Sequence, residues 1–305
     1  MGAIQAITAG VLRATATIFR TVVLKQMSQR TPVYPKYCFQ TPSGGAARVV
    51  LKALGDFPTM RELKGTADIA EYVETGWEIA NQPYHNTINV PREDIEHGDL
   101  SGHTMRLQMI GDDASVFPDK LLAARCMGGF TTKCYNGKNF FDTGHTHFKN
   151  GKATWDNKIT LKLTEDSFNM ARVGIMSVKH ENGDAFAIEM KLVLVVGPNN
   201  MVAAEKILKA VNKAGGETNT SAGTAELVVD PLITDDSWYV FNLAGVTRPF
   251  CFIESVPVEL NFAQDKETTD FILNQRFLFQ AYRRCQLQYL FPQVAFGSTG
   301  EDDPE

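Results

Sequence analysis

An apolar stripe that begins at Leu100 and continues for about three heptads constrains the fold more than any other feature of the sequence. Its members recur at alternating intervals of three and four residues, which places them on one face of an α-helix. A helix of about 28 residues would be about 42 Å long. Pro118 is expected to kink this helix or to begin a second, collinear segment, and Gly128 and Gly129 are expected to end it. The stripe consists of Leu100, His103, Leu107, Ile110, Ala114, Phe117, Leu121 and Ala124.

Two strand-like stretches, residues 60–70 and 77–90, precede the helix and are joined by a short segment that ends at Gly76. Side chains in the second stretch alternate between two faces, a period of two that predicts a long antiparallel hairpin. An isolated hairpin is only marginally stable in water, so support from outside its own domain is expected if it projects from the body. One face carries Tyr84, Asn86, Ile88 and Val90, and the other carries Trp77 and Ile79.

Charge is distributed unevenly along the chain, although the net charge is only −5. Residues 1–55 hold seven basic and no acidic groups, which leaves 23 basic and 35 acidic groups in the rest. In this basic arm, residues 4–28 are predicted to form an amphipathic helix and residues 31–47 an extended linker. The opposition of charge favours the arm of one copy lying on the body of a neighbour, with a solvated basic tail as the alternative. Nucleic-acid binding is a third option, weakened because the basic residues are scattered.

The remainder of the chain predicts an α/β unit followed by a strand-rich segment. Thr164 has the properties of an N-cap, with Glu165 and Asp166 in the first turn of the helix that follows. The acidic tail at residues 299–305 is expected to be disordered. The further predictions are a helix at 200–212 and strands at 192–196, 225–229, 238–242, 250–254 and within 277–296.

Composition excludes several classes of protein. The chain is 44% hydrophobic and 21% charged, as is typical of a globular protein. Its longest apolar run is far shorter than the about 20 residues of a membrane span, so we expect a soluble protein. Five scattered cysteines without a C-x-x-C pair indicate neither a zinc knuckle nor a disulfide framework, and they fit a reducing compartment. Arg13 and Arg20 interrupt the N-terminal apolar stretch, so no secretory signal is expected, although the stretch has some properties of a transit peptide.

The most enzyme-like segment is residues 141–147, Phe-Asp-Thr-Gly-His-Thr-His. It holds the D-T-G triplet of aspartic proteases, but only one such triplet occurs, so activity would require a homodimer. His145 and His147 could reach one metal from a strand, but the sequence does not show that a third ligand such as Asp142 converges on them. The alternative is a polar turn in which Asp142 and Thr143 bind local backbone donors. No dinucleotide, Walker A, G-x-S-x-G or H-E-x-x-H motif is present, so we expect no cofactor and no enzymatic activity.

Short motifs that encode no chemistry follow one another along the chain in a recognisable order. They are Leu-Gly-Asp-Phe-Pro at 54–58, Arg-Glu-Leu-Lys-Gly at 61–65, Ile-Ala-Asn at 79–81, Pro-Arg-Glu-Asp-Ile-Glu at 91–96, Pro-Asp-Lys-Leu at 118–121, Cys-Tyr-Asn-Gly-Lys-Asn-Phe-Phe-Asp at 134–142, Arg-Pro-Phe at 248–250 and Phe-Leu-Phe at 277–279. Their order and spacing resemble the Mu-like phage major head subunit family, the gpT family. The resemblance is good over residues 50–145 and patchier over 190–296.

This resemblance implies an α+β chain with the Hong Kong 97-type phage capsid fold. Periodicity alone gives the same parts in the same order, and no other stretch predicts a helix long enough to partner the one at Leu100. Arm, projecting hairpin and unpartnered helix make sense together when neighbouring subunits supply the missing contacts. The implied parts are an N-terminal arm at 1–55, an extended hairpin loop at 56–92, a peripheral domain with a long spine helix at 93–165, an α/β axial domain at 166–247, a return to the peripheral domain at 248–298 and the tail at 299–305.

The function predicted from this resemblance is that of a major capsid protein. Its copies would form pentamers and hexamers of an icosahedral shell around double-stranded phage DNA, without sequence-specific DNA binding and without a membrane. Scaffold, portal and decoration proteins are the implied partners, in the virion capsid and, during assembly, in the host cytoplasm. The alternatives are an encapsulin-like compartment shell and a metal-dependent hydrolase that uses Asp142, His145 and His147. The expected assembly contacts are Arg13, Arg20, Lys25, Trp77, Ile79, Tyr84 and Ile88.

Overall fold

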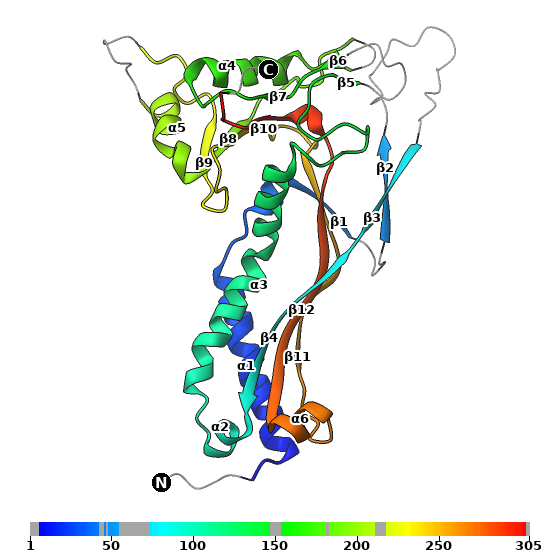
Figure 1. Ribbon diagram of the computed structural model, residues 1–305, viewed down its shortest axis with the longest axis vertical. Coiled ribbons are helices and arrows are strands. Elements are labelled where there is room, and N and C mark those ends of the chain that lie inside the picture. Colours follow the sequence, from blue (N-terminus) through cyan, green and yellow to red (C-terminus); the bar gives the residue numbers. More distant parts are fainter. Residues whose placement is uncertain are drawn as a thin grey trace.

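The computed structural model shows an elongated molecule with a long shaft, a broad lobe at one end of the shaft and a two-stranded hairpin beside it (Figure 1). The N-terminal helix runs along the shaft, and the last described residues lie in the lobe. The structure describes residues 6–42, 46, 48–54, 74–146, 154–180, 183–210 and 218–302. Within these ranges, no helix combines the length and apolarity needed to cross a membrane.

Two long helices, α1 (Ala9–Gln29) and α3 (Ser101–Gly128), lie side by side along the shaft. Helix α1 begins at Ala9 rather than at the predicted residue 4, because the Thr8 side chain accepts a hydrogen bond from the amide of Val11 and caps the helix. The prediction that α3 has no partner helix is wrong, since α1 buries its apolar face against α3 and the adjacent sheet instead of projecting from the body. That buried face consists of Leu12, Thr15, Ala16, Phe19 and Val23.

The contact between α1 and α3 is close at one point. A Cβ atom on Gly111 would lie 2.8 Å from both the carbonyl oxygen of Val23 and the Cβ of Gln26. Next to this crossing, Asp112 accepts hydrogen bonds at 3.0 Å from the side chains of Gln26 and Arg30. The absence of a side chain at residue 111 therefore sets the distance between the two helices.

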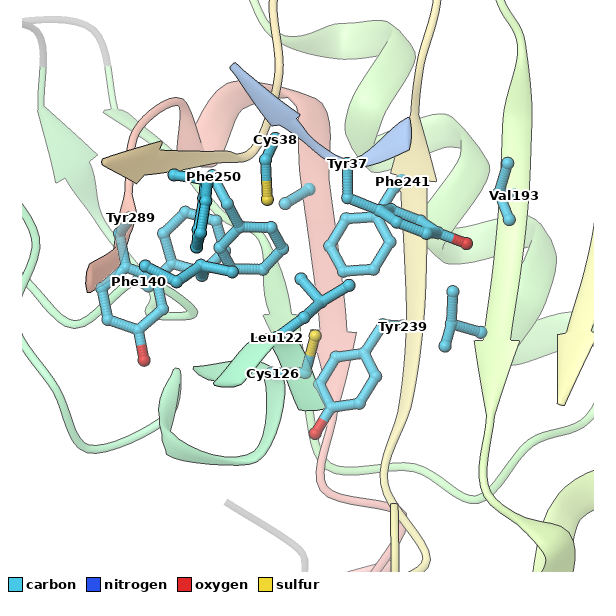
Figure 2. Packing of buried hydrophobic residues seen from close by; sticks show 14 of the residues in the cluster. Tyr37, Cys38, Leu122, Cys126, Phe140, Val193, Tyr239, Phe241, Phe250 and Tyr289 are labelled. Carbon is cyan, nitrogen blue, oxygen red and sulfur yellow. The ribbon is translucent and has the colours of Figure 1, made fainter. Parts of the chain in front are cut away.

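Helix α3 has the predicted length of 28 residues and continues through Pro118 without a break. Its buried face includes the predicted His103, Leu107 and Ile110 in the first half. After Pro118 the face rotates, because this half packs into a different core near the lobe (Figure 2). The predicted Ala124 is consequently exposed. The buried residues of the second half are Pro118, Leu122, Ala123 and Cys126.

A four-stranded sheet, here called the long sheet, forms the other layer of the shaft. Strand β11 pairs on one side in parallel with β1 and on the other in antiparallel with β12, which pairs in antiparallel with β4. The predicted alternation in β4 is confirmed, since the side chains from Tyr84 to Val90 alternate between more and less exposed positions. The strands of the sheet, with the short helices at its far end, are β1 (Cys38–Pro42), β11 (Phe250–Phe262), β12 (Arg276–Tyr289), β4 (Gln82–Pro91), α2 (Arg92–His97) and α6 (Thr269–Asn274).

The projecting hairpin consists of β2 (Arg48–Leu54) and β3 (Glu74–Ala80), which pair in antiparallel. The predicted first strand, residues 60–70, lies outside the described residues. The predicted second strand, residues 77–90, is divided at Asn81, because Asn81 is buried with its side-chain amide bonded to the carbonyl of Ala46 and the chain then joins a different sheet. Two strands lie across the predicted domain assignment: β2 lies in the segment 1–55 assigned to the arm, and β4 lies in the segment 56–92 assigned to the hairpin loop.

The lobe is built on a five-stranded sheet with the order β7-β13-β10-β8-β9. The predicted helix after Thr164 is confirmed as α4 (Glu165–Ser177), with a capping box between Thr164 and Ser167. The predicted helix at 200–212 is shorter in the described residues, as α5 (Met201–Leu208). The strands of this sheet are β7 (Lys158–Ile159), β13 (Ala295–Ser298), β10 (Trp238–Asn242), β8 (Leu192–Val196) and β9 (Glu226–Val229).

Two strands of the lobe come from segments that were assigned to the peripheral domain. Strands β7 and β13 pair in this sheet, although residues 93–165 and 248–298 were both assigned to the peripheral domain. The reason is that β13 fills the position between β7 and β10 and completes the sheet. Part of the predicted disordered tail is also ordered, because Asp302 accepts a hydrogen bond at 2.7 Å from the amide of Lys162 and forms an ion pair with its side chain. Residues 303–305 lie outside the described residues.

The close crossing at Gly111 predicts an unusual effect of alanine there. Alanine normally stabilises a helix relative to glycine by about 0.5–1 kcal/mol, but the new methyl group would collide with α1, so we expect Gly111→Ala to lower the free energy of unfolding by about 1–3 kcal/mol. Gly102 is the matched control, because it lies in the same helix and a Cβ atom there would meet no other part of the described chain within 4 Å. Urea unfolding measures both variants. Equal stabilisation by the two substitutions would show that α1 does not pack against α3 at this point.

Candidate functional site

The segment around Asp142 is the only candidate for chemistry that the sequence singles out, and the structure places it in a tight loop beside the core. Asp142 accepts hydrogen bonds from the amides of Asn139 and Thr143, at 3.0 and 2.8 Å. Its own amide donates to the side-chain oxygen of Asn157 at 2.9 Å. These bonds are those of the polar turn that was the alternative to a catalytic aspartate.

His145 is fully buried, and both of its ring nitrogens have partners. Nδ1 lies 2.9 Å from the side-chain nitrogen of Asn136, which can only donate, so Nδ1 accepts. Nε2 then carries the proton and donates to the side-chain oxygen of Asn157 at 3.1 Å. The ring is also stacked on Trp155 with the centroids 4.3 Å apart. In this arrangement neither ring nitrogen is available to bind a metal ion.

The environment of His145 disfavours its charged form. Burial lowers the pKa of His145 from 6.5 to about 4, and the hydrogen bond to Asn157 opposes this effect only in part. Asn157 itself is held by donating to the carbonyls of Phe140 and Pro292 at 2.8 and 3.2 Å. Hydrogen bonds through Asn157 therefore connect this loop to the C-terminal segment at Pro292. Sequence reasoning missed Asn136 and Asn157, because isolated asparagines carry no motif.

A metal site at this segment has no further support in the described residues. His147 lies outside them. Across the part of the chain that the structure describes, no cluster of three or more His, Cys, Asp or Glu side chains could hold a metal ion. The five cysteines are free and buried. Neither the Asp142 segment nor the cysteines therefore supply a metal site within the described residues.

The four residues of the predicted hairpin that were expected to contact a neighbouring copy lie in two different strands, β3 and β4. Ile79 is 2% exposed and packs against Cys251 and Ile253 of its own chain, so it is not free to lie over a neighbour in this conformation. Tyr84 and Ile88 belong to β4 in the shaft rather than to the hairpin, and both are half-buried against their own chain. The backbone of Trp77 lies in β3 of the hairpin, opposite Leu51. Contact of Trp77 with another copy stays a prediction.

Three of the arm's seven basic residues, Arg13, Arg20 and Lys25, lie on α1 and are exposed. Arg13 and Lys25 are exposed, and Arg20 donates from Nε to the carbonyl oxygen of Leu260 at 3.2 Å. The structure thus places the apolar side of the arm helix in the subunit's own core and its basic side on the surface. Contact of this side with another copy stays a prediction as well.

Helix α4 carries an apolar surface that sequence reasoning missed. Met170, Val173 and Met176 are 52%, 63% and 52% exposed. Phe168, Ala171 and Ile175 belong to the buried face of the same helix. The sequence signal for this surface is a predicted helix with apolar residues on two faces, because packing against a core needs only one apolar face.

Comparison with known proteins gives one family and one fold. A family model described as Mu-like prophage major head subunit gpT matches residues 12–159 and 150–233. The major capsid protein of Escherichia phage Mu is 36% identical over 117 residues, which cover 38% of this chain and 38% of that protein. The Mu-like prophage FluMu major head subunit of Haemophilus influenzae is 30% identical over 114 residues, or 37% of each chain. The matched regions thus span less than two fifths of these curated relatives.

Solved structures share the fold at low sequence identity. The procapsid of bacteriophage JBD30 aligns with a TM-score of 0.61 and 21% identity over 98% of this chain and 77% of that chain. The mature capsid of bacteriophage PhiM1 aligns with a TM-score of 0.55 and 10% identity over 90% and 89%. A virus-like particle from Pyrococcus furiosus aligns with a TM-score of 0.53 and 12% identity over 92% and 98%. The predicted α+β capsid fold is confirmed.

The buried His145 predicts a loss of stability in weak acid. The unfolded chain binds a proton at this residue near pH 6.5, whereas the folded chain does so only near pH 4. The free energy of unfolding should therefore fall as the pH decreases through this window, by up to about 3 kcal/mol. Urea unfolding at several pH values measures the slope, which should be smaller in His145→Gln and unchanged in the control His97→Gln, a variant of an exposed histidine. A slope that His145→Gln leaves intact would assign the acid sensitivity to other groups.

Proposed function

The chain belongs to the Mu-like prophage major head subunit gpT family, and from this premise we propose that it is a major capsid protein. Its copies assemble into pentamers and hexamers of an icosahedral shell that encloses double-stranded phage DNA. The observation that carries this proposal is the family match, which extends over residues 12–233 and includes most of the arm, the hairpin, α3 and β4 of the shaft, and part of the lobe. The predicted family is thereby confirmed, and the function of a shell subunit is structural rather than catalytic.

The shape of the subunit supports this function. A shaft with a projecting hairpin offers contacts at several separate places, which suits a subunit that must touch several neighbours at once. Permanent interfaces typically bury more than about 2,000 Å² in total, and many contacts made together hold an assembly even where each is weak. The phage names of the curated relatives favour a DNA-filled shell over a compartment for protein cargo.

The partners of the shell are proposed from membership of the family alone. We propose a scaffold protein during assembly, a portal at one vertex, decoration proteins on the finished shell, and packaged DNA held without sequence-specific contacts. Assembly takes place in the host cytoplasm, and the final location is the virion capsid. The net charge of −5 suits a wall that contains DNA without binding it tightly.

The assembly state is the direct test of the proposed function. We expect shells of megadalton mass, or rings of five or six copies, when the protein is expressed with its scaffold. Size-exclusion chromatography with light scattering measures the mass, and negative-stain microscopy of the void fraction shows the particles. A stable monomer or dimer both with and without the scaffold would reject the proposal.

The basic side of α1 predicts a contact that salt weakens. Arg13 and Lys25 are exposed at opposite ends of the helix, so reversing both charges (Arg13→Glu with Lys25→Glu) should leave the subunit folded. We expect the yield of shells to fall severalfold, and the wild-type shells to dissociate more readily at high salt, because exposed attractions are screened beyond about 10 Å at 0.1 M.

The matched control for this reversal is Lys179→Glu with Lys191→Glu, which also reverses two exposed charges, both in the lobe. Light scattering of assembled material quantifies all variants, and circular dichroism checks that each is folded. Equal yields from the arm variant and the control would remove the arm's charge from the assembly mechanism.

A further inference from the structure

A cavity of about 120 Å³ lies between α3 and the long sheet, and its lining comes from both cores of the shaft. Toward the lobe, Tyr84 and Phe117 line the cavity and pack against the core near the lobe. Away from the lobe, Val258 and Ala281 line it and pack in the core beneath α1. The cavity is therefore a gap between the two cores.

The gap has two structural causes. Two of the side chains that line it are small, those of Ala114 in α3 and Ala281 in β12. Strand β11 is also irregular at this level, because its ladder with β12 has register shifts between Glu254 and Val256 and between Val256 and Glu259. An irregularity of this kind bends a strand locally, so β11 does not present a regular row of side chains to α3.

The size and the lining of the cavity suit a single aromatic ring. Tyr84 and Phe117 form one wall, with ring centroids 4.5 Å apart and an angle of 54° between the ring planes. A further ring gains from edge-to-face or offset contacts with such a wall. Because an engineered cavity of about 150 Å³ in another protein binds benzene, a cavity of about 120 Å³ is sized for one six-membered ring rather than for a fused pair.

The charged groups at the cavity limit the charge of such a ligand. Arg283 lines the cavity, but it donates to the carboxylate of Glu254 at 2.7 Å and to the carbonyl oxygen of Ala114 at 3.2 Å. Asp113 also lines the cavity and forms an ion pair with Lys120. Each of these two charges already has a partner of opposite sign, which favours an uncharged ligand over an anion or a cation.

Asp113 can accept a further hydrogen bond. Its Oδ2 accepts from the side-chain amide of Asn86 at 3.2 Å, and its Oδ1 accepts from the ammonium group of Lys120. A carboxylate oxygen can accept two hydrogen bonds, so a donor on a ligand could share either of these oxygens. A hydroxyl group on the ring would supply such a donor without adding charge.

We propose that this cavity binds a small uncharged phenol, that is, one free aromatic ring with a hydroxyl group that donates to Asp113. The site belongs to the folded subunit and does not depend on the proposed shell. A ring in this position contacts α3 and the long sheet at the same time. It therefore joins the two cores and restrains the shaft at the irregular part of β11.

Titration of the full-length protein with 4-fluorophenol, followed by fluorine NMR, tests the binding. We expect saturable binding of one molecule per chain with a Kd of about 1 mM or lower. Fluorobenzene lacks the hydroxyl group and should bind about tenfold more weakly, because the hydrogen bond to the carboxylate is lost. The anion 4-fluorobenzoate should show no saturable binding.

Filling the cavity tests the location of the site. Ala114→Leu should weaken the binding of 4-fluorophenol about tenfold or more, because the ring and the new side chain compete for the same space. The matched control is Ala124→Leu, the same substitution at an exposed alanine of the same helix, which should bind as the wild type does. Asp113→Asn is a second variant that should weaken the binding of 4-fluorophenol and leave that of fluorobenzene unchanged.

Hydrogen exchange tests the effect of the ligand on the shaft. Saturating 4-fluorophenol should slow amide exchange in residues 254–259 of β11 by about threefold or more in the wild type and not in Ala114→Leu. Strand β8 in the lobe is the internal control, because it does not line the cavity, and its exchange should not change.

Three results would overturn the proposal. The first is no saturable binding of 4-fluorophenol, and the second is equal binding by Ala114→Leu and Ala124→Leu. The third is binding of N-acetyl-tyrosinamide about tenfold more tightly than 4-fluorophenol, which would assign the cavity to a tyrosine side chain of a partner protein instead of a free molecule.

Discussion

The packing of α1 and α3 on the long sheet is the interaction on which the rest of the molecule depends. Phe19 of α1 is 1% exposed and lies edge-on to Phe262 and Phe279, with ring centroids 5.9 and 5.6 Å away. Full burial of one such side chain contributes about 1.5–3 kcal/mol. Without α1, this aromatic cluster and the buried half of α3 would face water. The arm is therefore first a part of the subunit's own core, and only its basic outer side is left for other contacts.

Helix α3 and strand β12 give the shaft its rigidity, because each contributes to two separate cores. Leu107 of α3 and Phe279 of β12 lie in the core beneath α1, whereas Leu122 and Tyr289 lie in the core near the lobe. Bending the shaft would disturb both cores and the ladder between β11 and β12. The shaft can therefore hold the lobe and the hairpin at fixed separations, as the proposed function of a subunit with several neighbours requires.

The sequence predicts those elements whose signal is local. The N-cap at Thr164, the buried strand β8 and the length of α3 follow from the local sequence alone, and the structure confirms them. The partner of α3 and the strand β2 could not be predicted in the same way. Pairing of α1 with α3 depends on the small size of Gly111, and a single glycine inside a helical pattern carries no information about what approaches it.

The candidate site also combines features that the local sequence predicts with features that depend on contacts between distant residues. The Asp142 to His147 segment has a chemical motif, yet its described side chains are used to hold a loop. His145 needs both Asn136 and Asn157, residues that no motif connects to it. Conversely, the free edge of β4 is invisible in the sequence, because whether a strand lies at an edge depends on which other strands join the sheet. Only the register fixes which backbone groups remain open.

At the outer edge of β4, which is paired with no strand among the described residues, Pro83 and Pro91 bound a window of three outward N–H groups, those of His85, Thr87 and Asn89. Before assembly the monomer must not pair with itself without limit, and a long open edge would allow that. A window of three outward N–H groups is too small to hold two subunits by itself, since each hydrogen bond contributes only about 0.5–1.5 kcal/mol net. It contributes effectively once other contacts have fixed the neighbour in place, because its formation is then intramolecular in effect. In the proposed shell, the weakness of each single contact would make assembly depend on many contacts forming together.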